Sequence, residues 1–242
     1  MRRRIWILLI VAMSICSCGK VIDESIETVA YNIKDRFIVL GDSVSYGTGS
    51  RHHHSWADII QDSLHFQSFL NLSVPGAVAS SRTPDGKYDL VSQIKQIDSD
   101  DNFITLMIGI NDCIYQKKMG DIEKELTLSF DELDYKESFS QGFVYSLRLL
   151  RKRFPQSILV VIGPPDISKN SSDDLHIYIK AEKHICEVLG IPFIDLSNAP
   201  YSSMDPLLCC DHIHPTDRGY QVLACFVLPH LKSILSTFIS DS

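Results

Sequence analysis

Apolar runs of strand length alternate with amphipathic segments of helix length along most of the chain. The apolar runs predict strands over residues 37–40, 68–72, 103–108, 158–162 and 192–196. Apolar positions at helical spacing predict helices over residues 55–64, 90–97, 139–153, 175–189 and 216 to about 239. Strands that alternate with helices are typical of βαβ units, in which helices cover both faces of a parallel sheet. We therefore expect an α/β protein, a three-layer α/β/α sandwich with a five-stranded parallel sheet, in one domain over residues 36–242.

Several residues mark where the predicted helices begin, end or bend. Thr216 is a good N-cap for the last helix, because its hydroxyl can accept from a backbone N–H of the first turn. Gly190 is a suitable C-terminal cap for the helix before it. Pro229 is expected to kink or interrupt the last helix. The acidic stretch over residues 121–137 predicts a solvated loop or a short helix.

The first eighteen residues have the pattern of an export signal. Three arginines at positions 2–4 precede an apolar run over residues 5–15, which is too short for a permanent membrane span. The run ends in a segment that resembles a bacterial lipobox, and Cys18 follows the small Ser17 as a lipidated cysteine would. Cys16 fits this role less well, and an ordinary cleaved signal peptide is the alternative. We expect an exported lipoprotein, anchored to a membrane through Cys18, with a polar tether over residues 19–35.

Composition argues against a nucleic-acid partner and leaves open whether the cysteines form a disulfide. The 242 residues carry a formal net charge of -7, which argues against a nucleic-acid partner, since phosphate binding depends on clustered Lys and Arg. No cysteine spacing is typical of a zinc site, so we expect no metal. Either Cys113 forms a disulfide with Cys209 or Cys210, or the cysteines after the signal, which also include Cys186 and Cys225, are buried thiols.

Residues suited to nucleophilic catalysis follow the predicted strands. Residues 41–47 read Gly-Asp-Ser-Val-Ser-Tyr-Gly and place Ser43 on a glycine-framed turn after the first strand. A serine hydroxyl needs a base, and the base needs an orienting acid. Asp211 and His214 are three residues apart in an Asp-His-Ile-His-Pro segment and can supply both. Gly76 and Asn111, after the second and third strands, can add donors for an oxyanion beside the Ser43 N–H.

Together these segments resemble the SGNH, or GDSL-type, hydrolase family, whose marker residues are Ser, Gly, Asn and His. The matching segments are Gly-Asp-Ser at 41–43, the segment ending at Gly76, Gly-Ile-Asn-Asp at 109–112 and Asp-His-Ile-His-Pro at 211–215. The resemblance extends over about residues 36–235. It implies a flavodoxin-like sheet, a Ser43–His214–Asp211 triad and an oxyanion hole formed by Ser43, Gly76 and Asn111. The Val-Pro pair before Gly76 departs from many members and leaves the geometry of that N–H open.

Other candidate residues carry less weight. The histidines at 52–54 are consecutive and cannot all face one metal ion, so we interpret them as a solvated loop beside the nucleophile. His212 lacks the three-residue spacing to Asp211, and Asp205 has no defined relation to His214. We expect Asp42 and Asp112 to fix loops by hydrogen bonds. The chain has no Gly-x-Ser-x-Gly, phosphate-loop or His-Glu-x-x-His motif.

These observations predict a serine esterase that needs no cofactor. Export favours an extracytoplasmic substrate with a short acyl group, such as an O-acetylated carbohydrate or another small-molecule or glycan ester. Lysophospholipase and acyl-thioesterase activities occur in the same family and are the alternative, because the shape of the pocket decides among them. A noncatalytic glycan-binding lipoprotein is a hypothesis from another class, against which the intact Ser43, Asn111, Asp211 and His214 argue.

The lipidation hypothesis predicts the behaviour of a Cys18→Ala variant in cells. Without the thiol that carries the lipid, the protein should be released from membranes or should remain unprocessed. Metabolic labelling with a lipid precursor and fractionation of membranes measure this outcome, with Cys16→Ala as the control. Label that persists on Cys18→Ala and disappears from Cys16→Ala would assign the anchor to Cys16.

Overall fold

The computed structural model describes residues 36–100, 102–167 and 172–240. The predicted signal segment, Cys18 and the tether over 19–35 lie outside the described residues. The predicted domain over residues 36–242 lies within the described residues, apart from residues 101, 168–171 and 241–242.

The predicted five-stranded parallel sheet is confirmed. Its strands lie in the order β2-β1-β3-β4-β5 and every neighbouring pair is parallel. Their bounds are β1 Arg36–Gly41, β2 Ser68–Asn71, β3 Asn102–Met107, β4 Ile158–Ile162 and β5 Phe193–Ile194. Strands β3 and β4 are buried along their whole length, as expected for a sheet that helices cover on both faces. All carboxyl ends of the strands therefore meet at one edge of the sheet.

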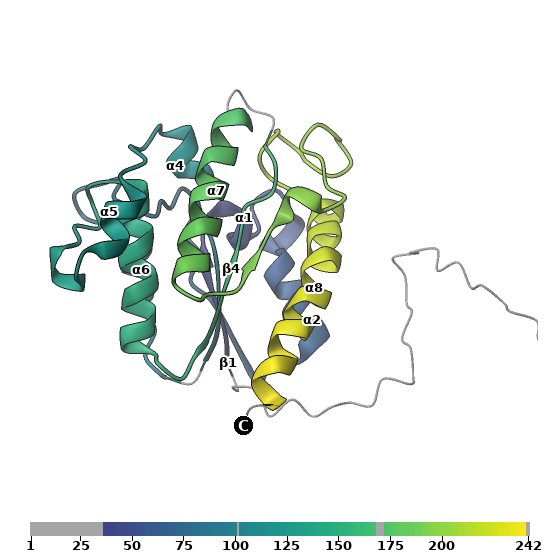
Figure 1. Ribbon diagram of the computed structural model, residues 1–242. Helices are drawn as coiled ribbons and strands as arrows, with labels where there is room; N and C mark the ends of the chain where they lie inside the picture. Colours follow the sequence, from purple (N-terminus) through teal and green to yellow (C-terminus); the bar gives the residue numbers. More distant parts are fainter. Residues whose placement is uncertain (1–35, 101, 168–171, 241–242) are drawn as a thin grey trace, which may run out of the picture. The chain divides into compact units, whose positions relative to one another are not determined.

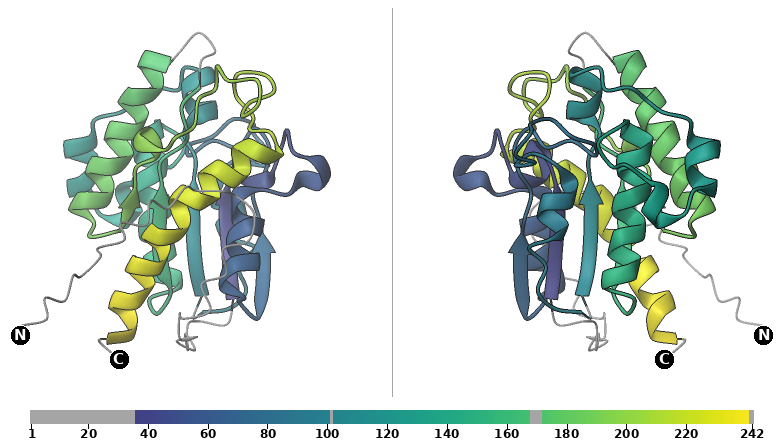
Figure 2. Two further views of the ribbon diagram at one scale, coloured as in Figure 1. Left: turned by 90° about the vertical axis from the view of Figure 1, so that its right-hand side faces the viewer. Right: turned by 90° about the vertical axis from the view of Figure 1, so that its left-hand side faces the viewer.

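Helices form one layer on each side of this sheet (Figures 1 and 2). Helices α2 (Trp56–Leu64) and α8 (Asp217–Ser240) pack against each other on one side. Helices α3 (Leu90–Ile94), α6 (Phe139–Arg153) and α7 (Ser172–Val188) cover the other side. A capping box of Ser55 and Asp58 starts α2, and the hydroxyl of Thr216 accepts from Gly219 N–H at the start of α8, as predicted.

Two helices differ from the prediction at their ends or in their interior. Helix α3 ends at Ile94 instead of residue 97, because the N–H groups of Gln96 and Ile97 bond to carbonyls only three residues back and tighten the chain into turns. Pro229 was expected to kink or interrupt helix α8, and the helix is not interrupted there, since it continues to Ser240. Pro229 lies on the exposed side of α8, where water can replace the hydrogen bond that proline cannot donate.

The apolar stripe of α8 is part of the protein core. Leu223, Val227, Leu231 and Leu235 are fully buried, and Tyr220 is buried beside them. By length and composition alone the segment Asp217–Phe238 could cross a membrane. Its burial against α2 and the sheet explains the same composition in a folded protein.

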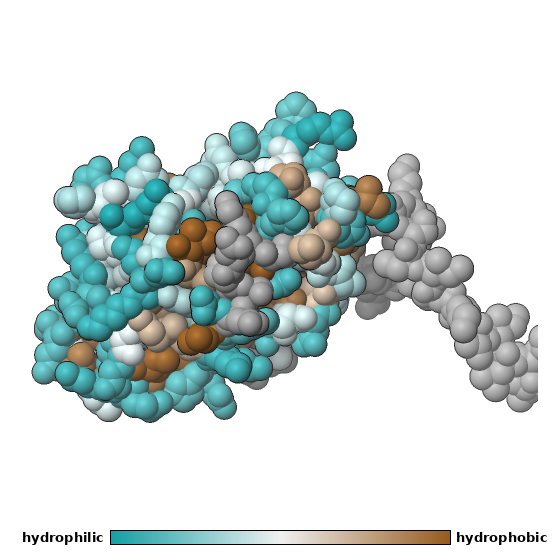
Figure 3. All heavy atoms as spheres, turned by 90° about the horizontal axis from the view of Figure 1, so that it is seen from above, coloured by the Kyte–Doolittle hydropathy of each residue, from teal (hydrophilic) through white to brown (hydrophobic). Residues whose placement is uncertain are grey.

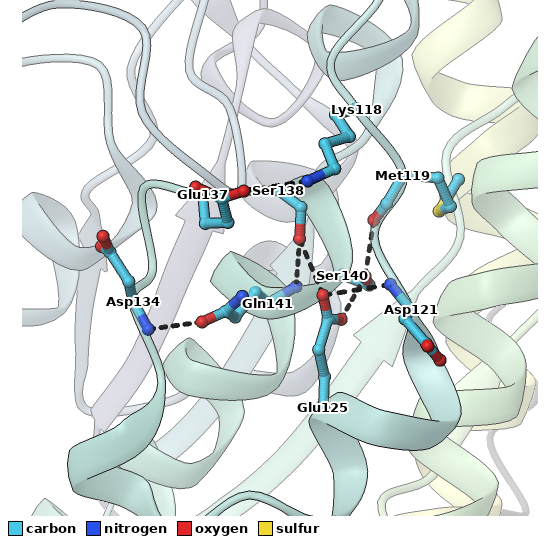
Figure 4. A network of polar contacts seen from close by, with 9 residues as sticks. All are labelled: Lys118, Met119, Asp121, Glu125, Asp134, Glu137, Ser138, Ser140 and Gln141. Carbon is cyan, nitrogen blue, oxygen red and sulfur yellow. Dashed lines mark hydrogen bonds and ion pairs between the residues drawn. The ribbon is translucent and has the colours of Figure 1, made fainter.

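The acidic stretch over residues 121–137 forms two short helical segments, α5 (Ile122–Thr127) and η2 (Phe130–Glu132). Figure 4 shows how the start of α5 is held against the start of α6. The carboxylate of Glu125 is buried, and it accepts hydrogen bonds from Ser138 and Ser140 and from the backbone N–H of Asp121. Three donors satisfy the buried carboxyl group, so this stretch is anchored at Glu125 although most of it is exposed.

Gly219 is a point where α8 contacts the loop that precedes it. A Cβ atom built at Gly219 would lie 2.0 Å from the carbonyl oxygen of Leu208 and 2.9 Å from Cβ of Pro215. The helix can approach the loop this closely because residue 219 has no side chain.

We predict that Gly219→Ala destabilises the protein. The loop must move away from the new methyl group, at a cost of about 1–3 kcal/mol, against a gain in helix propensity of about 1 kcal/mol. Urea unfolding measures the free energy, with Ser233→Ala at an exposed position of α8 as the control. Equal stability of the two variants would mean that the loop yields without cost.

Candidate active site

The first candidate residue, Ser43, begins a short helix at the carboxyl end of β1. Helix α1 (Ser43–Tyr46) is capped by Asp42, whose carboxyl oxygen accepts from Val44 N–H at 3.0 Å. Gly47 ends the helix with a φ of 94°, a left-handed conformation that glycine adopts without strain. One short turn with a cap at each end therefore places Ser43 at the edge of the sheet, where its residue is only 6% exposed.

The end of β1 is also held by a residue that sequence analysis did not single out. Gln93 of α3 accepts from Gly41 N–H at 2.9 Å and donates to the Gly41 carbonyl at 2.8 Å. The amide side chain thus pairs with both backbone groups of the last strand residue, as a neighbouring strand would. Gln93 is fully buried in a helix that is otherwise apolar on that face, and this polar residue on a buried face was the signal in the sequence.

Asp211 and His214 lie in a tight loop before α8. Residues 209 and 215 form an antiparallel bridge, and Cys210 N–H donates to the His214 carbonyl at 3.0 Å. Within this loop one oxygen of Asp211 accepts from the N–H groups of Ile213, at 3.1 Å, and His214, at 2.7 Å. The three-residue spacing between Asp211 and His214 therefore reflects a local turn, which the Asp211 carboxylate closes through these two hydrogen bonds.

The side chains of Ser43, His214 and Asp211 form a continuous chain of polar contacts. His214 Nε2 lies 2.9 Å from Ser43 Oγ, and His214 Nδ1 lies 2.7 Å from Asp211 Oδ2. The two contacts join segments 171 residues apart in the chain. Burial opposes ionisation of Asp211, but hydrogen bonds from the ring and backbone of His214 outweigh it, so the pKa of Asp211 lies below its ordinary value. Asp211 is therefore an anion next to the imidazole at neutral pH.

The rival residues lie in other places. His212 has a φ of 69° and its Nδ1 lies 3.3 Å from the Ser203 carbonyl oxygen, so its ring faces that segment. The carboxylate of Asp205 accepts from Leu207 N–H at 2.9 Å and organises the turn before the loop. In the structure the carboxylate that contacts His214 is that of Asp211.

The three consecutive histidines are exposed, as the sequence analysis expected of a solvated loop. They belong to or follow η1 (Arg51–His53), and the ring of His53 packs on Tyr46 with a centroid separation of 4.8 Å. A hollow of about 620 Å³ lies beside them, and its lining residues are Arg51, His52, His54, Ile59, Asp62, Asp217 and Gln221. The loop is thus next to the nucleophile helix through Tyr46, while this hollow opens toward α2 and α8.

The segment with Gly76 forms a type II turn. Ala77 N–H donates to the Val74 carbonyl at 2.9 Å, Pro75 occupies the second position, and Gly76 occupies the third with a φ of 82°. Val74 N–H donates to the Gly41 carbonyl and joins this turn to the end of β1. In the sequence, the Val-Pro pair left the geometry of this segment open. In the structure the pair begins the turn, and the left-handed position that follows it demands a glycine at position 76.

Asn111 lies on α4 (Ile110–Ile114), which follows β3, and is 8% exposed. Its side-chain amide donates to the Ala77 carbonyl at 3.0 Å and makes a longer contact of 3.4 Å with the Asp42 carboxyl. Asn111 therefore contacts both the nucleophile turn and the Gly76 turn. Among the described residues, no acceptor is hydrogen-bonded to the backbone N–H of Ser43 or Gly76.

Three carboxyl groups are buried beneath these loops. Burial raises the pKa of Asp42 to about 7, with a further contribution from the neighbouring charge of Asp112. Burial also raises the pKa of Asp112 to about 7, although the Ala79 N–H donates to both of its oxygens. Glu182 of α7 is fully buried, and burial together with the charges of Asp112 and Asp42 holds its pKa well above the ordinary value.

The cysteine pairing that the sequence left open is not formed. All five are thiols in the structure; Cys113, Cys186 and Cys209 are buried, as the other alternative expected, whereas Cys210 and Cys225 are exposed. The Cys210 thiol donates to the His214 carbonyl at 3.3 Å, and Cys209 is buried against Tyr201. Because both are occupied within their own loop, neither extends to Cys113 on α4, and the bridge between Cys113 and this loop, one of the two alternatives, is wrong for this structure.

A family comparison agrees with this arrangement. The model of the GDSL-like lipase/acylhydrolase family matches residues 39–222. The chain belongs to this family. It is accordingly an ester hydrolase of the GDSL, or SGNH, type, and the flavodoxin-like α/β fold implied by the resemblance is confirmed. Among curated proteins none matches the chain.

Solved structures share the fold at low sequence identity. A protein from Lactobacillus plantarum is 20% identical with a TM-score of 0.69, and the match covers 83% of this chain and 98% of that one. A GDSL-like lipase from Bacteroides uniformis is 16% identical with a TM-score of 0.63, covering 86% and 100%. An inhibitor-bound aryl esterase from M. smegmatis is 12% identical with a TM-score of 0.62, covering 82% and 99%.

The buried carboxyls predict how stability depends on pH. A carboxyl whose pKa is raised by folding binds its proton more tightly in the folded state, so the stability it contributes is complete below about pH 4 and is lost as the pH rises to about 7. Asp112→Asn cannot ionise and keeps one oxygen to accept from Ala79. We therefore expect the variant to gain about 1–4 kcal/mol relative to wild type between pH 4.5 and pH 7.5.

Urea unfolding at several pH values measures this difference. Asp98→Asn is the control, because a hydrogen bond and the charge of Arg36 lower the pKa of Asp98, so its stability difference from wild type changes only below about pH 4 and stays constant between pH 4.5 and pH 7.5. A stability difference between Asp112→Asn and wild type that does not change with pH would show that Asp112 is ionised throughout.

Proposed function

We propose that this GDSL hydrolase is an exported serine esterase that uses Ser43, His214 and Asp211 as a catalytic triad and prefers short acyl esters such as O-acetylated carbohydrates. The observation that carries the triad is the contact chain from Ser43 Oγ through both ring nitrogens of His214 to Asp211. A histidine between a serine and an ionised carboxylate is the arrangement that activates a weak nucleophile.

The reaction has two steps. His214 takes the proton of Ser43 as Ser43 Oγ attacks the acyl carbonyl, and the developing imidazolium is stabilised by the anionic Asp211. His214 then gives this proton to the leaving alcohol, and an acyl-enzyme remains on Ser43. A water that donates its proton to His214 attacks the acyl group, and the acid leaves as Ser43 regains the proton.

The oxyanion formed in each step is to be bound by Ser43 N–H, Gly76 N–H and the Asn111 amide. The two backbone groups are available, since they have no acceptor among the described residues. One N–H of Asn111 holds the Ala77 carbonyl, and the other makes only the 3.4 Å contact with Asp42. The contact at 3.4 Å is long for a hydrogen bond, so the second N–H can donate to an oxyanion, which is a stronger acceptor.

The surroundings of Ser43 support a polar substrate. Tyr46 and Tyr115 are 37% and 42% exposed; Tyr46 is the last residue of α1, which begins at Ser43, and Tyr115 directly follows α4, which carries Asn111. Exposed tyrosine rings offer an apolar face with a polar edge, which suits a sugar ring better than a long acyl chain. Seen from above, the surface is mostly hydrophilic, with apolar side chains in small groups (Figure 3).

The alternatives remain hydrolysis of lysophospholipids or acyl-thioesters. A noncatalytic glycan-binding role is the hypothesis from another class. Export and membrane anchoring through Cys18 are part of the proposal and rest on the sequence of the first eighteen residues. They agree with a substrate outside the cytoplasm.

We predict that Ser43→Ala and His214→Ala each lower kcat by about a thousandfold or more, because the covalent step needs both groups. Hydrolysis of para-nitrophenyl esters from acetyl to long acyl measures the loss and the chain-length preference together, and circular dichroism checks folding. His212→Ala is the matched control and should retain most activity. A folded Ser43→Ala protein with wild-type turnover would remove the triad, and a maximum at long acyl chains would favour the lipid alternative.

The carboxylate partner is tested in the same assay. Asp211→Asn should lose about a thousandfold in kcat/KM, because the imidazole loses its ionised acceptor, whereas Asp205→Asn should change it little. In wild type, kcat/KM should fall as the pH is lowered, since protonated His214 cannot accept the Ser43 proton. The reverse order of the two variants would reassign the orienting acid to Asp205.

A further inference from the structure

One cationic side chain is fixed beside the expected oxyanion hole without a role in the reaction described above. Arg82 Nη1 donates to the Gly76 carbonyl at 3.0 Å. Its guanidinium carbon lies 4.6 Å from the ring centroid of Tyr88 and 4.4 Å from that of Tyr115. Tyr115 is the first residue after α4, the helix of Asn111. Arg82 thus contacts the Gly76 turn and the end of the Asn111 helix together.

The contact with Gly76 depends on the missing side chain of that residue. A Cβ atom built at Gly76 would lie 2.3 Å from Arg82 Nη1. The left-handed φ of the turn already favours glycine, and the guanidinium occupies the space that a side chain would take. The segment that carries Arg82 is held as well, because Arg82 N–H donates to Asp89 and the Lys117 ammonium donates to the Ser81 carbonyl.

The charge of Arg82 is not neutralised within the described part of the chain. Arg82 is exposed and forms no ion pair with a described carboxylate, although the whole protein is acidic with a net charge of -7. Asp85 accepts from Thr83 and from Lys87 N–H, and Asp89 is buried and accepts from the Arg82 backbone. One guanidinium N–H holds Gly76, which leaves the other donors of a rigid, planar cation for a ligand.

We propose that Arg82 binds a carboxylate of the substrate next to the scissile ester. The proposal rests on the esterase function and narrows its substrate to esters that carry an anionic group, such as an acetylated uronic acid. Two tyrosine rings and the Gly76 carbonyl fix the orientation of the guanidinium before the ligand arrives, so little side-chain freedom is lost on binding. A planar guanidinium pairs with a carboxylate through two parallel hydrogen bonds, which a lysine cannot reproduce.

The kinetic test compares charged and neutral esters of similar shape. The pairs are O-acetylated methyl galacturonate with O-acetylated methyl galactoside, in which the charge is on the alcohol, and para-nitrophenyl hemiglutarate with para-nitrophenyl hexanoate, in which it is on the acyl group. For at least one pair, Arg82→Met should lower kcat/KM about tenfold or more for the charged ester, mainly through KM, and much less for the neutral one. Arg82→Lys should restore only part of the preference.

Lys87→Met is the matched control. Lys87 contributes a cation near the same Tyr88 ring, with its ammonium 5.4 Å from the ring centroid, but it is not bound to Gly76. The Lys87→Met variant should leave the preference for the charged ester nearly unchanged. Equal losses of kcat/KM for charged and neutral esters in Arg82→Met would overturn the proposal and make Arg82 a clamp of the Gly76 turn. Equal loss of the preference in Lys87→Met would also overturn it, in favour of a general effect of charge.

A binding measurement separates this proposal from the esterase function. In Ser43→Ala protein the Arg82 Nε–H resonance, assigned by its absence from the double variant with Arg82→Lys, should shift when a carboxylate ester of the effective pair is added. Its neutral partner should cause no shift. If wild type hydrolyses neither pair, all four esters are titrated into the Ser43→Ala protein. The Arg82 resonance then still decides whether a carboxylate binds, although the esterase proposal fails. An Arg82 resonance that no charged ester moves would overturn the carboxylate site even if Ser43-dependent hydrolysis is present.

Discussion

The parallel pairing of β1 with β3 is the interaction on which the site depends. Gly41 and Met107 are partners at the last position of this ladder, so the two chains leave the sheet side by side. A Cβ atom at Gly41 would lie 2.4 Å from the Met107 carbonyl, which shows how closely they approach. Ser43 follows one strand by two residues and Asn111 follows the other by four. A change of register between these strands would separate the nucleophile from its expected oxyanion donor.

The loops at this edge are fixed by polar groups that are costly to bury. Asp42 caps the nucleophile helix, Asp112 accepts from Ala79 N–H, and Glu182 lies beneath both. Each carboxyl has a pKa above its ordinary value, because burial favours the neutral form. The edge therefore carries ionisable groups where the rest of the sheet interior carries aliphatic and aromatic ones. Fixed geometry at the loops is gained at the expense of stability toward neutral pH.

The histidine is fixed independently of the sheet. Its loop is closed by the bridge between residues 209 and 215, and it is held against α8 by the close approach of Gly219 to Leu208. Helix α8 in turn packs on α2, which starts at Trp56, ten residues after the nucleophile helix α1 ends at Tyr46. The position of His214 relative to Ser43 is thus set by helix packing on one face, while Asn111 and Gly76 are positioned by the strands.

Sequence by itself determined the elements and the chemistry that is local in the chain. Continuous apolar runs identified the five strands, since helices cover the sheet on both faces, and the 3.6-residue repeat, which follows from backbone geometry, identified the main helices. The Asp211–His214 turn and the type II turn at Pro75-Gly76 are likewise encoded over four residues. At Pro229 the helix is not interrupted, because an exposed position allows water to bond to the carbonyl that the proline leaves without a donor.

Only the tertiary structure decided which distant groups meet. Gln93 contacts the Gly41 backbone, the buried Glu182 interacts with Asp112, and Arg82 lies between two tyrosines; in each case no local pattern in the sequence names the partner. Cys209 and Cys210 neighbour the site in sequence, yet their contacts are within their own loop and no bridge to Cys113 forms. The reason is physical: local pattern reports the conformation of a few residues, whereas side-chain contacts between loops depend on the packing of every layer between them.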